Sequence, residues 1–360
     1  MNYENDDGTS PSVTILPFMS GENPHLSQLK QSLEDRGVEV RTLDRAFFLP
    51  AFLSNSTQVI HLQWIHPLIM ETGRPIKSIF KTVAYFLQVL LLKFLGVTLV
   101  WTLHNLHNHE KTYLWLDNLG SKFTARMADS VHVYCQRGKT LAREYYELDT
   151  TSSFEVIPYG NYVDYYPNTL SQDSARSDLS LGSSDMVYLF VGSIRAYKGI
   201  PRLVNAFKGL EVPDKRLVVA GSTKDDRSEE ILNRASQAQE SIIFRPGFVD
   251  VEAMNRFFNA ADIVTLPFEN ILNSGSLILA MSYGKACIVP SIGCVPEHIA
   301  ENGGFLYEPG NTEGLKSAMA QAFENRERLE SMGERNYEKA SEAFAWDRIG
   351  KQMEAFYHRA

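Results

Sequence analysis

The sequence has 360 residues, of which 44% are hydrophobic and 22% are charged, a composition typical of a globular protein with a large core. This length predicts two domains. The net charge of -8 argues against a general nucleic-acid-binding surface. The first twelve residues are polar and acidic without an apolar signal core, so we predict a short flexible tail at 1–12.

Short apolar runs alternate with helix-forming segments along the first half of the chain. Alternation of this kind predicts βαβ units and a parallel sheet. We expect a helix at 26–36, ended by Gly37. The expected strands are 13–17, 38–40, 61–64 and 97–103.

A long apolar segment needs separate treatment, because Gln88 and Lys93 are the only strongly polar side chains between residues 82 and 103. Gly96 interrupts this segment, and Lys93 at the centre of a bilayer costs about 2.5–3.5 kcal/mol. We therefore predict a helix at 76–95 and a strand after it, rather than a membrane span.

The predicted helix 76–95 is apolar nearly all round, so it is either buried or faces something apolar. Ile79, Val83 and Leu87 fall on one side, and Tyr85 and Val89 on the other. Arg74, Lys77 and Lys81 stand near its start. Two interpretations stay open, a membrane-surface patch and a core helix.

Histidines follow the strand at 97–103 directly, in the run His104-Asn105-Leu106-His107-Asn108-His109-Glu110. In open α/β sheets, ligands bind at the carboxyl edge, where such side chains collect. A histidine there suits proton handling or a hydrogen bond to substrate. His107, His109 and Glu110 are zinc-ligand types, but no clear partner pair stands elsewhere and the three cysteines lack metal-ligand spacing. We predict no metal site.

The second half repeats the pattern of strands that end in polar loops. A strand at 186–191 runs into a loop with Arg195, Lys198 and Gly199, which suits a phosphate site. Ala261-Asp262 before a later strand echoes Ala128-Asp129 in the first half, which indicates two similar α/β halves. Polar residues between the halves predict a linker at 169–184.

A loop passes into an apolar helix at Asn273-Ser274-Gly275-Ser276. Serine and asparagine are preferred where a helix begins, and glycine allows a ligand to approach. The free N–H groups and partial positive charge of a helix start suit phosphate. The alternative is an ordinary capped helix without a ligand.

Taken together, these segments resemble GT-B glycosyltransferases, most of all the family 4 group that uses nucleotide-sugar donors. Residues 192–199 resemble the family's G-R-L-x-x-x-K-G segment, and residues 261–267 resemble its A-D-x-x-x-x-P strand. Gly284-Lys285-Ala286 resembles its G-K-P segment, and Val295-Pro296-Glu297 resembles its G-x-P-E turn. Residues 101–110 resemble the W-T-x-H-N-x-x-x-H-E segment of bacterial and archaeal surface-polysaccharide transferases.

The resemblance implies an α/β fold of two Rossmann-like, doubly wound parallel-sheet domains that face a cleft. It implies an N-terminal acceptor domain at 13–168 and, after the linker, a nucleotide-sugar domain at 185–340. The last segment, 341–360, would be a helix that crosses back to the N-terminal domain.

Site residues carried over by position fall into three groups. His104 and Glu269 are the candidate catalytic residues. The candidate donor-binding residues are Arg195, Lys198, Arg245, Val249, Asn273, Ser274, Gly275 and Ser276. The candidate acceptor-side residues are Asn23, Trp64, His66, Asn105 and His109.

Two departures from the family pattern stand out. Ser193 occupies the position of the family's arginine, whose charge Arg195 would replace. The family's E-x7-E motif is absent, because Ile271 and Leu279 occupy the two glutamate positions. Glu269 lies two residues before the first position and is the candidate substitute.

The resemblance implies a hexosyltransferase that moves a sugar from a nucleotide-diphosphate donor to a glycan or lipid-linked glycan. Such an enzyme would use no cofactor, metal or nucleic acid. It would be cytoplasmic, and peripheral at the inner face of the plasma membrane if 76–95 binds lipid. The alternatives are a GT-B-like sugar-phosphate epimerase and a non-catalytic glycosyltransferase-like subunit.

Overall fold

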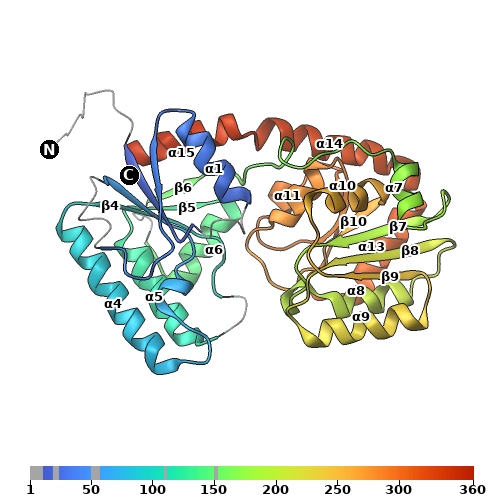
Figure 1. The fold of residues 1–360 in the computed structure, drawn as a ribbon, viewed down its shortest axis with the longest axis horizontal. Helices are drawn as coiled ribbons and strands as arrows, with labels where there is room; N and C mark the ends of the chain where they lie inside the picture. The colour runs from blue at the N-terminus through green and yellow to red at the C-terminus, as the bar shows by residue number, and fades with distance from the viewer. Residues whose placement is uncertain (1–10, 19–23, 50–56, 109–111, 150–152) are drawn as a thin grey trace. The chain divides into compact units, whose positions relative to one another are not determined.

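The computed structural model describes residues 11–18, 24–49, 57–108, 112–149 and 153–360. The chain forms two compact units, one of residues 1–160 with 345–360 and one of residues 161–344 (Figure 1). Each unit has a six-stranded sheet in which neighbouring strands pair in parallel. Helices flank both sheets, which confirms the predicted α/β class with two Rossmann-like domains.

The first unit has the strand order β2-β1-β3-β4-β5-β6. Helix α15 packs on α1, while α4 packs with α3 and α5. The strands are β1 (Ser12–Leu16), β2 (Glu39–Thr42), β3 (Val59–Leu62), β4 (Thr98–Thr102), β5 (Ser130–Val133) and β6 (Phe154–Val156). The helices are α1 (Pro24–Glu34), α3 (His66–Ile69), α4 (Pro75–Phe94), α5 (Leu114–Met127), α6 (Gln136–Tyr146) and α15 (Trp346–Arg359).

The second unit has the strand order β12-β11-β10-β7-β8-β9. Its strands are β7 (Met186–Val191), β8 (Lys215–Gly221), β9 (Ile242–Pro246), β10 (Ile263–Thr265), β11 (Ala286–Pro290) and β12 (Gly304–Tyr307). Its helices are α7 (Gln172–Asp178), η1 (Ala196–Lys198), α8 (Ile200–Lys208), α9 (Asp226–Ala238), α10 (Val251–Ala260), α11 (Gly275–Ser282), α12 (Val295–His298), α13 (Thr312–Glu324), η2 (Arg326–Arg328) and α14 (Leu329–Ala343).

The two Ala-Asp pairs occupy equivalent places, as the predicted similarity of the two halves requires. Asp129 Oδ2 accepts hydrogen bonds from Leu99 N at 2.8 Å and Lys93 Nζ at 2.6 Å. Asp262 Oδ2 likewise accepts from Val187 N at 2.7 Å and an Arg176 nitrogen at 2.8 Å. In each unit the aspartate before one strand therefore fixes the start of the neighbouring strand.

The segment 169–184, for which we predicted a linker, is part of the second unit instead. It contains α7, whose N-terminus is capped by Ser171 and which packs on α10. Arg176 of α7 forms an ion pair with Asp262, in which Nη2 donates to both carboxylate oxygens at 2.8 Å. The compact units divide at 160/161 and 344/345, so the polar composition of this segment reflects the surface of a helix.

The final helix α15 belongs to the first unit, as expected for a segment that crosses back. Ser32 Oγ of α1 donates to Trp346 O at 2.7 Å. A Cβ at Gly350 would overlap Ser32 Oγ, so the two helices approach closely at a glycine. Tyr357 OH lies 2.7 Å from His61 Nδ1 of β3, which attaches the end of α15 to the sheet.

Helix α4 has one buried face and one exposed apolar face. Tyr85, Val89 and Leu92 are fully buried, and α4 lies beside α5 in Figure 1. Phe80 is 71% exposed and Phe94 is 86% exposed. The interpretation as a core helix is therefore wrong for the outer face. Among the described residues α4 is the one helix long and apolar enough to cross a membrane, by length and composition only, and 33% of its 18-residue apolar window is buried.

Candidate active site

Two loops pack against each other at the carboxyl ends of β7 and β10, which are neighbours in the sheet. Glu269 N donates to Tyr197 O at 2.9 Å. Gly199 has φ +69°, and a Cβ there would overlap the carbonyl oxygen of Pro267. A residue with a side chain at position 199 would therefore separate the loops, and glycine is needed for the close approach.

Lys198 lies at the centre of this arrangement. Its Nζ donates to Ser276 Oγ at 3.3 Å and lies 4.5 Å from the centroid of the Phe268 ring. Burial and, to a smaller extent, the positive charge of Arg195 lower the pKa of Lys198 from 10.5 to about 8. A lysine ammonium beside a second cation provides positive charge for an anion.

Helix α11 begins at the same place. Ser274 is its N-cap, and the Ser274 Oγ accepts a hydrogen bond from Leu277 N at 3.1 Å. The next two amide groups, of Gly275 and Ser276, donate to no acceptor within the described part of the chain. The predicted cap and the predicted free amide groups are both present, because the cap satisfies one donor and leaves others open.

Buried polar atoms beside these loops also lack partners. Asn273 Oδ1 and Ser193 Oγ are shielded from solvent and have no hydrogen bond to any residue that the structure describes. Such atoms are costly unless a ligand or water satisfies them. Together with Lys198, Arg195 and the start of α11, they form a group that we call the Lys198 cluster.

Glu269 lies near the cluster but is engaged elsewhere. Its carboxylate forms an ion pair with Arg202 of α8 at 3.0 Å, and its side chain is 44% exposed. The two glutamate positions of the family motif are occupied by Ile271, which is buried, and by Leu279 of α11. Neither position therefore supplies a carboxylate. Sequence reasoning missed Arg202, although a cation four residues after Lys198 is a usable signal.

Arg245 and Val249 are placed apart from the Lys198 cluster. Arg245 lies near the carboxyl end of β9, at the edge of the sheet and two strands from β7. Its exposed guanidinium donates to Phe244 O at 3.5 Å. No described contact joins either residue to Lys198, and their assignment to a nucleotide base stays a prediction.

His104 lies at the carboxyl end of β4 in the first unit, as predicted. Its ring stacks on Trp64, with centroids 3.9 Å apart. Its Nε2 lies 2.8 Å from Gln63 Oε1, and its Nδ1 lies 3.1 Å from Tyr134 OH. Both ring nitrogens are thus engaged, by two residues that sequence reasoning missed.

The other acceptor-side residues vary in how well they are placed. His66 begins α3, four residues after the last residue of β3, and Asn105 follows His104 in the loop after β4. Both are half-buried. Asn23 and His109 lie outside the described residues.

Further histidines form a chain of hydrogen bonds below His104. His132 Nε2 donates to Ile157 O at 2.8 Å, since a carbonyl oxygen only accepts. A neutral His132 then accepts at Nδ1 from Thr102, at 2.8 Å. Thr102 Oγ1 in turn accepts from His61 Nε2 at 2.6 Å, and His61 Nδ1 accepts from Tyr357 OH at 2.7 Å.

Neutral rings can form every bond of this chain. Burial lowers the pKa of His132 to about 4 and that of His25 to about 3. Burial also holds the pKa values of His61 and His104 well below 6.5. His104 therefore stays neutral around pH 7 and is held in one orientation by its neighbours.

Within the described ranges, no three His, Cys, Asp or Glu side chains come close enough to hold a metal ion. His109 and Glu110, two of the residues weighed for zinc, lie outside those ranges.

Comparison with known proteins identifies the second unit. Residues 171–339 match the family described as glycosyl transferases group 1. The chain is 24% identical over 322 residues to GDP-mannose:glycolipid 4-beta-D-mannosyltransferase of Xanthomonas campestris pv. campestris, which covers 86% of this chain and 84% of that protein. It is 25% identical over 223 residues to lipopolysaccharide 1,2-N-acetylglucosaminetransferase of Salmonella typhimurium, which covers 58% of each chain.

Solved structures show the same fold across the chain. Sucrose-phosphate synthase from Thermosynechococcus elongatus superposes with a TM-score of 0.77 at 16% identity, over 97% of this chain and 98% of that one. HepE from Anabaena, in complex with UDP, superposes with a TM-score of 0.72 at 14% identity, over 97% of this chain and 100% of that one. Residues 171–339 thus match the glycosyl transferases group 1, and the chain has the GT-B fold of solved glycosyltransferases.

Proposed function

We propose that the protein transfers a hexose-type sugar from a nucleotide-diphosphate donor to a glycan or lipid-linked glycan acceptor. The Lys198 cluster is the observation that carries this proposal. A cation with a lowered pKa, a second cation, two amide groups without acceptors and two buried polar atoms without partners meet there. Diphosphate is a ligand that uses all of them.

The same groups suit the chemistry of transfer. The leaving diphosphate gains negative charge as the glycosidic bond breaks, and fixed donors aimed at developing charge lower the barrier. Lys198, Arg195 and the start of α11 would supply this stabilisation without a metal or a further cofactor. His104 would lie against the transferred sugar as a neutral ring, and Glu269 would act from its ion pair with Arg202.

The relatives support the substrate classes. The Xanthomonas relative is named for GDP-mannose and a glycolipid, and the Salmonella relative for lipopolysaccharide. HepE was solved with UDP and with UDP-glucose. A nucleotide sugar is named for the Xanthomonas relative and for HepE, with different bases, and a lipid-linked acceptor is named for the two bacterial relatives.

A thermal-shift screen over UDP, GDP, ADP and TDP tests the donor. We expect one nucleotide to raise the Tm of the wild-type protein, because a ligand at about 100 times its Kd adds about 2.7 kcal/mol of stability. The same nucleotide should raise the Tm of Lys198→Ala by a smaller amount, because the variant keeps the amide groups at the start of α11 but loses one cation. If none of the four shifts the wild type, the donor assignment fails. A second assay measures sugar transfer with and without an added acceptor. Transfer that requires the acceptor excludes both alternatives, because an epimerase uses no separate acceptor and an inactive subunit transfers no sugar.

The pKa of Lys198 gives the reaction a predicted pH dependence. The free enzyme loses the positive charge of Lys198 as the pH rises through about 8. We expect kcat/KM for the donor to fall above that pH, since this ratio reports groups of the free enzyme. Lys198→Arg should remove this decline, because arginine stays protonated. Lys208→Ala, an exposed lysine on α8, should keep it. A wild-type profile that is flat to about pH 10 contradicts the assignment.

We also propose that the outer face of α4 binds the surface of an anionic membrane, at the inner face of the plasma membrane. Exposed apolar side chains recur along one stripe of this helix: Ile76, Phe80, Val83, Leu87, Leu90, Leu91 and Phe94. Trp115 and Leu119 of the adjacent α5 are 58% and 48% exposed. Arg74 and Lys77 stand at the start of α4, and both form ion pairs with the same glutamate, Glu71.

The position of α4 in the unit suits a lipid-linked acceptor. Its N-terminus follows α3, which leaves the carboxyl end of β3 beside Trp64. His104 follows β4, the neighbour of β3, at the same edge. An acceptor held in the membrane under α4 would therefore present its glycan to the acceptor-side residues.

A further inference from the structure

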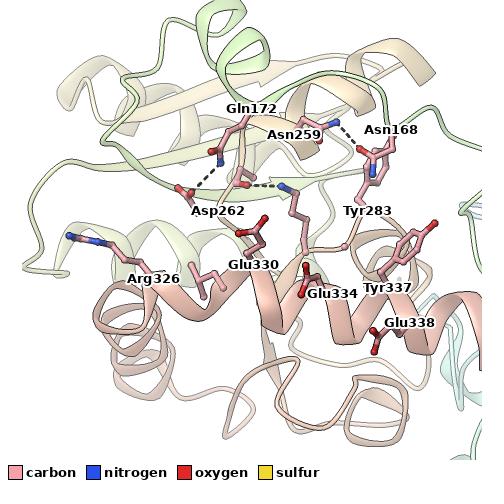
Figure 2. Close-up of a pocket in the computed structure, with 14 residues that line it drawn as sticks. Asn168, Gln172, Asn259, Asp262, Tyr283, Arg326, Glu330, Glu334, Tyr337 and Glu338 are labelled. Carbon is pink, nitrogen blue, oxygen red and sulfur yellow. Dashed lines mark hydrogen bonds between the residues drawn. The ribbon is translucent and has the colours of Figure 1, made fainter.

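A second cavity lies in the second unit, at the edge of the sheet opposite to the Lys198 cluster. Asp262 precedes β10 and Lys285 precedes β11, so the cavity adjoins the amino ends of strands (Figure 2). Its volume is about 850 Å³. This volume falls within the range of about 300–1,000 Å³ that is typical of small-molecule sites. The proposed transfer reaction makes no use of it.

The floor of the cavity carries a buried cation. Lys285 Nζ donates to Ala261 O at 2.9 Å. Burial lowers the pKa of Lys285 to about 8, while the carboxylates of Asp262 and Glu330 oppose this effect. Asp262 is fully engaged, because Arg176 holds both of its oxygens at 2.8 Å. The ammonium group of Lys285 therefore keeps protons for a further acceptor.

One wall is the exposed side of α14. Glu330, Glu334 and Glu338 recur at four-residue spacing, which places them on one side of the helix. None of the three forms an ion pair with a residue that the structure describes. Tyr337 stands on the same wall and is 39% exposed, so its ring offers a flat apolar surface (Figure 2).

The other wall carries side-chain amides. Asn259 Nδ2 donates to Asn168 Oδ1 at 2.9 Å, and Gln172 Nε2 donates to Asp262 Oδ1 at 3.4 Å. These bonds hold the amides in place and leave the Asn168 NH2 group and the Gln172 carbonyl for a ligand. The cavity thus combines fixed amides, carboxylates, the ammonium group of Lys285, the guanidinium group of Arg326 and one exposed aromatic ring.

This combination selects among ligand classes. A phosphorylated ligand is repelled by the three carboxylates of α14. A simple cation is repelled by the ammonium group of Lys285 and makes no use of the N–H groups of the side-chain amides. Hydroxyl groups both donate and accept, so they satisfy carboxylates, amides and an ammonium group at once. A ring with an apolar face also packs on tyrosine.

We propose that this cavity is a second carbohydrate site, which binds an oligosaccharide segment away from the Lys198 cluster. The proposal rests on the proposed function only in that a glycosyltransferase meets glycans as its acceptors or products. Such a site would raise the local concentration of a long acceptor by holding a part of it that does not react.

Saturation-transfer NMR with maltoheptaose, cellohexaose and mannohexaose tests the site directly. We expect transfer to at least one of them, and at least about a 10-fold loss of affinity in Tyr337→Ala. Leu306→Ala, an exposed apolar residue of similar exposed fraction in the same unit, is the matched control. A thermal melt of each variant verifies that it is folded.

A triple variant separates sugars from cations. Replacing Glu330, Glu334 and Glu338 by glutamine keeps hydrogen-bonding capacity but removes charge, so sugar binding should persist within about 3-fold. Spermine serves as the competing probe. The proposal is overturned if none of the three sugars binds, if Tyr337→Ala binds as well as wild type, or if only spermine binds and the triple variant abolishes it. The nucleotide-induced Tm shift should be the same in Tyr337→Ala as in wild type, so this site and the donor site fail independently.

Discussion

Replacing Lys198 with alanine should lower kcat for sugar transfer by roughly 10²–10³-fold, the usual effect of removing one fixed donor from a site of developing negative charge. Lys198 is the cation that meets the start of α11, through Ser276 Oγ at 3.3 Å. Its ammonium group would contact the diphosphate as the bond to the sugar breaks. Initial rates with saturating donor and acceptor measure this effect.

Matched variants separate this role from a structural one. Lys208→Ala removes a lysine from the exposed side of α8 and should leave kcat unchanged. Ser274→Ala removes the cap of α11, which costs about 0.5–2 kcal/mol of stability, and should also weaken donor binding. Donor hydrolysis without acceptor should fall in Lys198→Ala as well. A Lys198→Ala enzyme with wild-type kcat would remove Lys198 from the mechanism.

The second large effect concerns the outer face of α4. Changing Phe80, Leu87 and Phe94 to serine should weaken binding to anionic liposomes by about 10³-fold or more. These side chains are 71%, 63% and 86% exposed, so each has surface to bury in the lipid. Full burial of such a side chain contributes about 1.5–3 kcal/mol, and 1.4 kcal/mol corresponds to a factor of ten. Flotation with phosphatidylglycerol vesicles measures the binding.

The same experiment carries its own controls. Leu306→Ser changes one exposed apolar residue of the second unit and should float as the wild type does. Sedimentation of the triple variant tests the competing occupant, a second copy of the chain. If the wild type is a dimer that the triple variant dissociates, or if it fails to float at low salt, the outer face of α4 is not a membrane surface.

Local pattern predicted much of each unit. The strands 186–191 and 97–103 and the helix 76–95 appear close to their expected bounds, because apolar periodicity and glycine stops are local signals. The two Ala-Asp pairs signalled equivalent strand starts, which the hydrogen bonds of Asp129 and Asp262 explain. The expected linker is the counterexample, since composition alone did not show that Arg176 is buried against Asp262.

The candidate site was predicted unevenly for a related reason. Lys198 and the start of α11 stand on motifs with fixed spacing, so their meeting was expected. Gln63, Tyr134 and Tyr357 were missed, because they come from three distant segments and acquire a role only where the sheet brings them to His104 and His61. No local spacing marks a hydrogen bond between residues 61 and 357.

The amino-acid sequence by itself determined the alternation of strands and helices, the loops that carry Lys198 and Ser274, and the apolar character of α4. Only the tertiary structure decided which face of α4 stays exposed, how His104 is held, and that a cavity adjoins Lys285 at the other edge of the sheet. The physical reason is that periodicity and capping act within a few residues, whereas burial, a shifted pKa and a lining of side chains depend on segments that only the fold brings together.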